Sequence, residues 1–372
     1  WLILNVKSMD GYIGYAEFSD SNGSEKTLLV AIEEIGSLLI GKKINSVQDL
    51  VLNLRKKYRQ VLPGIMFKAI SAFENALWDL QSKRSGMLIA ELLQRKTYGS
   101  ESRNFKCYWS HCPTTRIRAH QHINSKPIVE YSDLEIISKE ISRLNFSAFK
   151  TNLVQIKPKP KVWMPGFNKN LDLLQDTLPQ SYPEELANIL KTIMGGSEEL
   201  ECIVDLNYNV DLLGFQAIQN SLSELNVRWL EIDFDDFNLY NEILIQKKIL
   251  ICTGENLLRL NHFEKVIFDE RISIVSIDVL WNGLTESLKI AELSIKSGKK
   301  IAVHNYNGSL ATSISLVFLS MLPAETLELM EFDFDDVHWR DSIVTNPPKF
   351  SEGSFNYIPG LGWNNNPLSS QL

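Results

Sequence analysis

The chain has 372 residues, of which 44% are hydrophobic and 22% are charged, and its formal net charge is −7. This length suits two domains, or one large α/β barrel with attachments, and the balanced composition excludes disordered and fibrous proteins. The charges are spread along the chain without a Lys/Arg block, so we expect neither nucleic acid nor a membrane surface as a partner. The expected partner is a small molecule.

Four cysteines lie in or beside apolar segments, without the short paired spacing of zinc or redox sites. We therefore expect Cys107, Cys112, Cys202 and Cys252 to be reduced core residues of a cytoplasmic protein. No apolar run reaches the roughly 18 residues of a membrane helix, and no signal-peptide pattern is present. The sequence opens at Trp1, without Met and in what reads as the middle of a strand, so we expect it to lack its natural N-terminus.

The first part of the chain predicts a small α+β unit. Residues 3–20 alternate around a Met-Asp-Gly turn, as a β-hairpin does. Helices are expected at about 46–60 and at 64–86, where Gly86 supplies a C-cap. We place this unit at residues 1–104.

From residue 105 onward, short apolar segments alternate with longer amphipathic ones. The expected strands are residues 105–111, 147–152, 201–207, 227–232, 250–255, 272–278, 300–305 and 327–332. This alternation predicts a parallel sheet, and its eight repeats favour closure into a barrel over residues 105–332. The alternative is a doubly wound open sheet, although no Gly-rich phosphate turn follows the first strand.

Two segments interrupt the alternation. Residues 333–372 are rich in Pro, Gly and aromatic side chains, so we expect a weak or missing helix there and a path back over the N-terminal unit. Residues 153–170 are rich in Pro and Lys, which predicts irregular structure. This second segment is either a lid that carries Trp163 and Met164 to the site or a surface excursion.

Acidic side chains end three successive predicted strands. Asp205, Glu231 and Glu255 are each separated by about one β/α unit, so they should meet at the end of the barrel where barrel enzymes place their chemistry. A lone acidic residue there is usually an ordinary loop residue. Three neighbouring carboxylates repel one another unless a cation lies between them, and all-oxygen ligands favour Mg²⁺ over zinc or copper. The sequence therefore predicts a Mg²⁺ site.

Asp278 and His304 end the sixth and seventh predicted strands. A carboxylate beside an imidazole orients the ring and raises its basicity, which suits a general base. Lys150 ends the second strand, where a neighbouring cation would depress its pKa or let it stabilise developing charge. Glu331, at the eighth strand, could donate a hydrogen bond to a substrate carboxylate if it were protonated.

Several other polar side chains lie at or near the predicted strand ends. These are His111, Asn152, Asn207 and Asn305. They suit hydrogen bonds to the hydroxyl groups of a polyhydroxylated substrate better than contacts with an aromatic one. We assign no chemistry to the remaining histidines.

An ordered set of motifs resembles the enolase superfamily, in its mandelate racemase/muconate lactonizing enzyme subgroup. The motifs are 69-AISAFENALWDL-80, 149-FKTN-152, 204-VDLN-207, 229-WLE-231, 253-TGE-255, 276-SID-278, 303-VHNYNG-308 and 330-MEFDFDDVHW-339. The resemblance implies an α/β fold: a modified TIM barrel, (β/α)7β, with an α+β N-terminal capping domain completed by the C-terminal tail. It also implies a homo-oligomer.

The resemblance also implies roles for individual residues. Asp205, Glu231 and Glu255 would be the Mg²⁺ ligands, Asp278 and His304 the catalytic dyad, Lys150 a base or charge stabiliser, and Glu331 the partner on the carboxylate side. The sequence departs from the racemase pattern at 150-KTN-152, where Asn152 replaces a second lysine base. It departs from the galactonate dehydratases at Asn207, where they carry a histidine.

These features together favour one reaction. We expect a Mg²⁺-dependent dehydratase of a sugar acid, an aldonate or an aldarate, that yields a 2-keto-3-deoxy acid through α-proton abstraction and an enediolate. We expect His304 to protonate the departing β-hydroxyl or the enol and Lys150 to take the α-proton, with the order reversed for a substrate of the opposite configuration. The alternatives are an epimerase or lactone cycloisomerase on a sugar acid, and a barrel that binds sugar acids without turnover.

Overall fold

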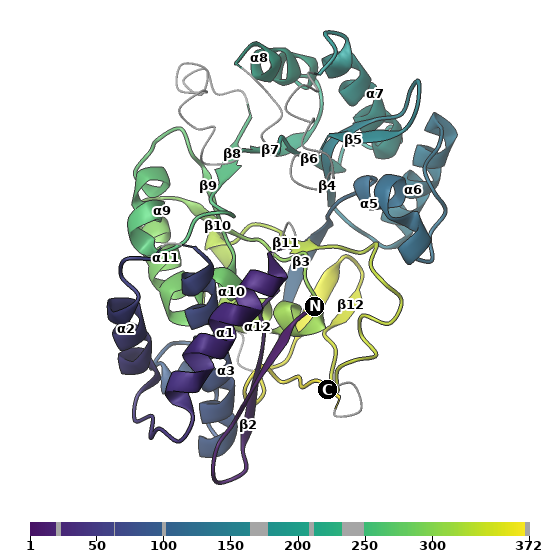
Figure 1. Ribbon diagram of the computed structural model, residues 1–372. Coiled ribbons are helices and arrows are strands. Elements are labelled where there is room, and N and C mark those ends of the chain that lie inside the picture. The colour runs from purple at the N-terminus through teal and green to yellow at the C-terminus, as the bar shows by residue number, and fades with distance from the viewer. Residues whose placement is uncertain are drawn as a thin grey trace.

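The structure is a computed structural model of the 372-residue chain, and it describes residues 1–19, 24–62, 64–98, 102–163, 178–207, 212–232 and 249–368. The N-terminal elements form a cap of helices and a hairpin, and the following elements form a barrel of strands surrounded by helices (Figure 1). The fold is therefore the α/β barrel with an α+β cap that the sequence predicts.

The cap contains the predicted hairpin, one long helix more than predicted, and one short helix that was not predicted either. Strands β1 (Ile3–Lys7) and β2 (Ile13–Glu17) pair antiparallel, and α2 (Val47–Lys57) and α3 (Ile65–Ser85) match the expected helices. The additional long helix is α1 (Glu25–Leu39), which buries Leu28, Ala31, Ile32 and Ile35. These positions follow the i, i+3, i+4, i+7 spacing of an amphipathic helix, so the sequence does carry the signal for α1. A short helix, α4 (Ile89–Leu92), follows.

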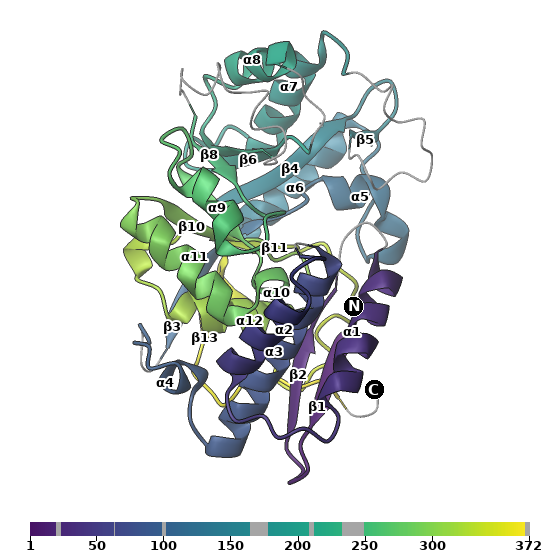
Figure 2. The ribbon, with the colours of Figure 1, turned by 60° about the vertical axis from the view of Figure 1, so that its left-hand side comes forward.

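Helix α3 is the centre of the cap, and Figure 2 shows it beside β2 and close to the barrel helices. It ends at Gly86, whose φ of +69° is the left-handed conformation that the predicted C-cap requires. Strand β2 approaches α3 closely at Gly14. A Cβ atom on Gly14 would lie 2.6 Å from the Cβ of Leu80 and would also collide with the backbone carbonyl of Ala76.

We expect Gly14→Ala to lower the free energy of unfolding by about 1–3 kcal/mol, because a backbone atom must move to admit the methyl group. Gly36→Ala is the matched control: its Cβ would meet only Phe73, at an ordinary 3.6 Å, inside α1. Alanine is the better helix former, so the control should be neutral or more stable by up to about 1 kcal/mol. Urea unfolding of both variants tests the pair, and equal midpoints would contradict the close approach.

All eight predicted strands occur. They are β3 (Arg103–Trp109), β4 (Ala148–Gln155), β6 (Glu201–Asp205), β7 (Val227–Glu231), β8 (Ile251–Thr253), β9 (Ile274–Ile277), β10 (Lys300–Val303) and β11 (Met330–Phe332). The strands from β3 to β10 are parallel, and each pairs with the next in this list. Strand β11 pairs with β3, and a parallel bridge between Ile301 and Leu327 joins it to β10. The sheet is thus a closed barrel and not the open sheet kept as the alternative.

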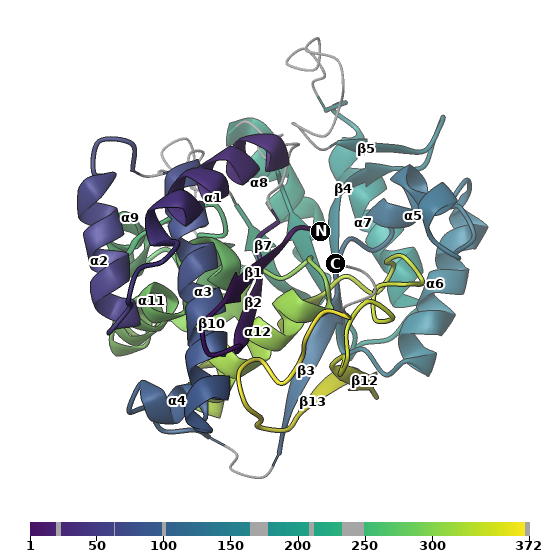
Figure 3. The ribbon, with the colours of Figure 1, turned by 60° about the horizontal axis from the view of Figure 1, so that its bottom comes forward.

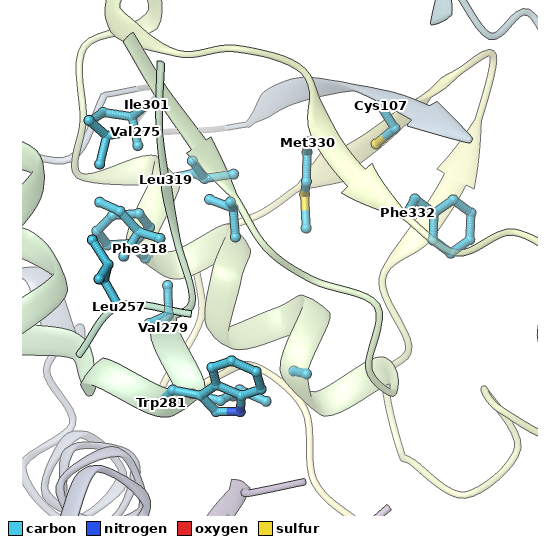
Figure 4. Packing of buried hydrophobic residues seen from close by; sticks show 14 of the residues in the cluster. Cys107, Leu257, Val275, Val279, Trp281, Ile301, Phe318, Leu319, Met330 and Phe332 are labelled. Carbon is cyan, nitrogen blue, oxygen red and sulfur yellow. The ribbon is translucent and has the colours of Figure 1, made fainter. Parts of the chain in front are cut away.

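Helices follow most of the strands. They are α5 (Thr114–Arg118), α6 (Tyr131–Arg143), α7 (Tyr182–Met194), α8 (Leu212–Ser221), α9 (Leu260–Ile267), α10 (Val279–Asn282), α11 (Leu284–Lys296) and α12 (Ser309–Ser320), with 3-10 turns η1 (His120–His122) and η5 (Ala324–Thr326). Figure 4 shows how residues that alternate with interior positions, such as Val275 and Ile301, lie near Phe318 and Leu319 of α12. Trp281 and Val279 of α10 belong to the same apolar cluster.

The barrel interior contains one apolar layer with a side chain from each strand or its approach. Its members are Tyr108, Ala148, Ile203, Trp229, Cys252, Ile274, Ala302 and Leu329. Alternate residues of a strand face the same side, so the residue two positions later also points inward. Those later residues include Ser110, Lys150, Asp205, Glu231, His304 and Glu331. The interior therefore changes from apolar to polar toward the carboxyl ends of the strands, which we call the barrel mouth.

The structure corrects the prediction for residues 153–170. Strand β4 continues to Gln155, and β5 (Lys161–Trp163) pairs with it antiparallel, so part of this segment is a hairpin and not irregular. The reason is burial, since Leu153 and Val154 are fully enclosed. Trp163 packs against Tyr182 at the start of α7, with ring centroids 6.4 Å apart. The rest of the segment, including Met164, lies outside the described residues.

The C-terminal segment returns to the cap, as predicted. Strands β12 (Lys349–Ser351) and β13 (Ser354–Tyr357) form a hairpin, and β13 also pairs antiparallel with β3 (Figure 3), which the sequence did not predict. Trp363 is buried in the cap, where its backbone N–H donates to Asp79 (3.0 Å) and its indole N–H donates to the carbonyl of Tyr15 (2.8 Å). Between Phe332 and Lys349 the chain forms no helix.

One expectation from composition holds for the cysteines. The four cysteines are buried and free, as expected for core residues. None of the described helices combines the length and the apolar character that crossing a membrane requires.

Candidate active site

The three predicted carboxylates meet at the barrel mouth. One oxygen from each of Asp205, Glu231 and Glu255 lies within 4.8 Å of the other two. Asp205 and Glu231 are directly paired in the register of β6 and β7, and Glu255 follows the end of β8 by two residues. The first two are buried and the third is partly exposed, so the cluster has one open side.

The donors of this cluster fit a hard divalent cation. All are carboxylate oxygens, and a group of buried negative charges without a cation is unfavourable. Burial raises the pKa of Asp205 to about 6; Lys150 opposes this rise, and the charge of Glu231 adds to it. The raised pKa is the expected behaviour of a carboxylate enclosed beside another carboxylate.

Two asparagines hold Asp205 in place. Asn207 donates to one Asp205 oxygen from its backbone (3.1 Å) and from its side chain (2.7 Å). Asn152 donates to the other oxygen (3.2 Å) and to the side-chain oxygen of Asn207 (2.5 Å). The sequence suggested contacts with substrate hydroxyls for both residues. In the structure their amide hydrogens face Asp205 and each other, so their geometry favours orienting this carboxylate.

Asp278 and His304 form the predicted pair. Nδ1 of His304 lies 2.9 Å from one oxygen of Asp278, and the other oxygen of Asp278 accepts the backbone N–H of Trp281 at 2.8 Å. Because Nδ1–H donates a hydrogen bond to the carboxylate, the Nε2 atom of a neutral imidazole carries the lone pair. Nε2 lies 3.7 Å from an oxygen of Glu255, so this basic nitrogen faces the carboxylate cluster.

Two aromatic rings enclose the imidazole of His304. Trp281 lies at a centroid distance of 5.3 Å and Tyr306 at 4.9 Å. Neither Trp281 nor Tyr306 was among the predicted site residues. Trp281 follows Asp278 by three residues and Tyr306 follows His304 by two, so proximity to the dyad was the available signal.

Lys150 is enclosed between two carboxylates. Its Nζ lies 3.1 Å from Glu231 and 2.8 Å from Glu331, and the side chain is almost fully buried. Burial alone lowers the pKa of this lysine, but Glu231 and Glu331 outweigh burial and raise the pKa well above its ordinary value. The lowered pKa considered from the sequence depends on a neighbouring cation and stays a prediction. A protonated Lys150 suits charge stabilisation better than proton abstraction.

Glu331 accepts hydrogen bonds on both oxygens. Ser110 donates at 2.6 Å to the oxygen that Lys150 contacts, and the backbone N–H of Asn305 donates to the other at 2.7 Å. Burial raises the pKa of Glu331, but the charge of Lys150, followed by His304 and His111, outweighs burial and holds the pKa well below its ordinary value. Glu331 is thus ionised, and the protonated donor considered from the sequence does not fit these contacts.

Asn305 does not face a substrate. It is buried, and its side-chain amide donates to Thr312 and to the backbone carbonyl of Glu331, both at 3.3 Å. Its side-chain oxygen accepts from Ser315. The prediction that Asn305 binds substrate is therefore incorrect in this structure, because every polar atom of its side chain faces the protein interior.

His111 lies at the mouth at the end of β3. Its Nδ1 is 3.1 Å from an oxygen of Asp333, a residue that the sequence analysis did not single out. The available signal was the strand alternation, since Asp333 follows the inward-facing Glu331 by two residues. The mouth thus contains two histidine–aspartate pairs, of which only one was predicted.

Comparison with known families agrees with this architecture. Residues 1–94 match the mandelate racemase/muconate lactonizing enzyme N-terminal domain, and residues 146–367 match the enolase C-terminal domain-like family. Together these matches cover most of the chain. The chain belongs to the enolase superfamily, in the mandelate racemase/muconate lactonizing enzyme subgroup.

Its relatives include sugar acid dehydratases. The L-talarate/galactarate dehydratase of Salmonella typhimurium is 23% identical over 82% of this chain and 67% of its own length. The arabinonate dehydratase of Saccharolobus solfataricus is 23% identical over 91% of this chain and 82% of its own length.

Solved structures with the same fold include other reaction types. A Burkholderia xenovorans protein, provisionally named an L-alanine-DL-glutamate epimerase and solved with magnesium and fumarate, has a TM-score of 0.91 and 25% identity, covering 99% of this chain and 90% of its own. The 3,6-anhydro-D-galactonate cycloisomerase of Zobellia galactanivorans has a TM-score of 0.77 and 18% identity, covering 99% and 92%.

Proposed function

We propose that this chain is a Mg²⁺-dependent dehydratase that converts a sugar acid, an aldonate or an aldarate, to a 2-keto-3-deoxy acid. The observation that carries the proposal is the position of His304: its Nε2, backed by Asp278, faces Glu255 of the carboxylate cluster at 3.7 Å. A base in this position lies beside the place where a cation would hold the carboxylate of the substrate.

The carboxylate cluster fits the metal of the proposed reaction. Asp205, Glu231 and Glu255 would hold Mg²⁺, and their one partly exposed member leaves a side open toward a ligand. When bound, Mg²⁺ supplies positive charge that stabilises the negative charge developing on the substrate carboxylate as the α-proton leaves. Asn152 and Asn207 keep Asp205 oriented for this role.

Proton abstraction and charge stabilisation are assigned to different residues of the chain. His304 takes the α-proton at Nε2, while Asp278 fixes its tautomer and stabilises the imidazolium that forms. Lys150 remains protonated between Glu231 and Glu331, so it contributes a fixed positive charge near the developing enediolate. Of the two roles considered for Lys150, base and charge stabiliser, these contacts favour the second.

Two features favour elimination over epimerisation. The position after Lys150 and Thr151 is Asn152, and an amide cannot act as the second base that two-base racemisation needs. The curated relatives cited above are also named dehydratases. Epimerisation remains the second candidate because the Burkholderia xenovorans structure, 25% identical, carries an epimerase name.

One experiment separates these reactions. The protein is incubated with Mg²⁺ and a panel of aldonates and aldarates in D₂O and followed by proton NMR. A 3-deoxy-2-keto product would establish the dehydratase and its substrate class. Exchange of the α-proton with inversion and without elimination would instead establish an epimerase, and binding without exchange or product would contradict both.

Mg²⁺ binding should weaken in acid. The pKa of Asp205 is raised to about 6 by burial, and a metal ion binds only the ionised carboxylate. Above pH 6 the site is already ionised, so affinity should be nearly constant. Below pH 6 proton and metal compete, and the dissociation constant should rise by up to about tenfold per pH unit. Calorimetric titration of the wild type with Mg²⁺ between about pH 5 and pH 8 measures this dependence. An affinity that stays flat down to pH 5 would contradict the raised pKa.

A further inference from the structure

Strand β3 delivers a second histidine–carboxylate pair to the barrel mouth. Asp333 and Ser110 both lie within hydrogen-bond distance of Nδ1 of His111, at 3.1 and 3.4 Å. These contacts engage Nδ1 alone, so Nε2 is the ring nitrogen left for a ligand. About a fifth of the His111 side chain is exposed, and so is about a sixth of the Asp333 side chain. The pair is therefore packed into the mouth without being sealed from it.

The imidazoles of His304 and His111 both contact the ring of Tyr306. Tyr306 contacts the imidazole of His304 at a centroid distance of 4.9 Å and that of His111 at 6.2 Å, with the second pair of planes perpendicular. His304 ends β10 and His111 follows β3, with β11 between them in the barrel. Both side chains therefore belong to one site and reach it from different strands.

The backbone at His111 is held in an uncommon conformation. Its φ is +51°, a left-handed value that costs a residue with a side chain roughly 1–2 kcal/mol. The surrounding turn fixes this conformation, because the carbonyl of His111 accepts from Thr115 (3.0 Å) and the next residue, Cys112, donates to the carbonyl of Lys150 (2.9 Å). Backbone strain of this kind persists where surrounding contacts hold the residue in place, and such residues often lie at functional sites.

Charged groups around His111 favour its protonated form. Burial lowers the pKa of its imidazole, but Asp333 first and Glu331 next outweigh burial, and the pKa lies above its ordinary value although Lys150 opposes the rise. The surroundings of His111 therefore suit a proton donor. Nε2 of His304, by contrast, faces the carboxylate cluster and suits a base.

We propose that His111 is the general acid of the dehydration, protonating the departing β-hydroxyl while His304 removes the α-proton. This inference rests on the proposed function. The electron pair of the broken C–H bond forms the double bond, the C–O bond to the β-hydroxyl breaks, and that oxygen takes the Nε2 proton of His111 and leaves as water. The resulting enol takes a proton from solvent at the β-carbon to become the 2-keto acid.

Two polar residues near His111, Lys150 and Asn152, are poorly suited to donate a proton to the leaving group. Lys150 is paired with two carboxylates, and Asn152, one strand away from His111, has no titratable group. His111 therefore provides the proton donor that the 150-KTN-152 sequence lacks. Asp333 would act through His111, as a positioning residue that fixes the tautomer and stabilises the charged ring.

The test compares His111→Asn with wild type on a sugar acid that the wild type dehydrates. Asparagine tolerates the left-handed backbone well, so this variant should fold. We expect elimination to fall by about 10²- to 10⁴-fold, while deuterium from D₂O still enters the α-position, because His304 and the metal site are intact. His122→Asn, a change of an exposed histidine in η1, is the matched control and should behave as wild type.

A substrate analogue separates acid catalysis from a structural role. With fluorine in place of the β-hydroxyl the leaving group needs no proton, so His111→Asn should eliminate fluoride at a rate within about tenfold of wild type. Asp333→Asn should show the same pattern with a smaller loss, since it leaves the imidazole in place. Equal loss of exchange, dehydration and fluoride elimination in His111→Asn would overturn the proposal, and so would unchanged dehydration. Failure of the wild type to dehydrate any acid would overturn the proposed function first, before any variant is compared.

Discussion

Replacing His304 by asparagine should remove α-proton exchange and lower turnover by about 10²- to 10⁴-fold, because no other described group is both basic and adjacent to the carboxylate cluster. The contacts of Lys150 with Glu231 and Glu331 favour its protonated form, so we do not expect Lys150 to replace His304 as the base. The variant is compared with wild type by NMR in D₂O, following exchange and product together.

The same variant should still bind Mg²⁺, since His304 is not one of the clustered carboxylates. Calorimetry checks this, and His338→Asn, which alters an exposed histidine of the C-terminal segment, is the matched control for activity. Exchange that continues at the wild-type rate in His304→Asn would place the base elsewhere. A wild type with tight ligand binding and negligible turnover, unchanged by the substitution, would favour the non-catalytic barrel.

Replacing Lys150 by methionine should lower the free energy of unfolding by about 3–5 kcal/mol. The substitution leaves Glu231 and Glu331 buried without the lysine that both contact. Removing one partner of a buried ion pair is costly because the other partner stays charged and unpaired. Urea unfolding in the absence of Mg²⁺ measures the loss. Lys106→Met, at an exposed position of β3, is the control and should change stability by less than about 0.5 kcal/mol.

A second substitution tests the cause of this loss. Adding Glu331→Gln to Lys150→Met removes one of the two unpaired buried charges, so the double variant should be more stable than Lys150→Met alone. The double variant could instead lose as much free energy of unfolding as the two single variants lose together. That result would mean that the Lys150–Glu331 contact contributes nothing to stability, and it would contradict the explanation given for Lys150→Met.

The sequence predicted the parts of the molecule that depend on local pattern. Apolar segments at regular intervals identified the eight strands, and acidic residues at strand ends identified the cluster of Asp205, Glu231 and Glu255. Both signals come from the alternation of a strand and the convergence of parallel strands at one end, which are properties of short segments.

The sequence could not predict which polar groups pair with one another. The ionisation of Lys150 depends on Glu331, far away along the chain, and the pairing of His111 depends on Asp333. Asn305 and Asn152 occupy the expected places but turn toward protein groups. The direction of a side chain in the barrel mouth depends on the charges and hydrogen-bonding groups around it. Those neighbours come from strands far apart in the sequence, and they meet only when the barrel has closed.

The position of β3 has a consequence for the order in which the molecule is built. This strand pairs with β4 on one side, and on the other it pairs with both β11 and β13, which lie near the end of the chain. During synthesis the ribosome releases β11 more than 200 residues after β3, so the barrel stays open until β11 has been made. The pair of His111 and Asp333 therefore cannot form on a nascent chain that has not yet reached residue 333, although His111 itself is made early.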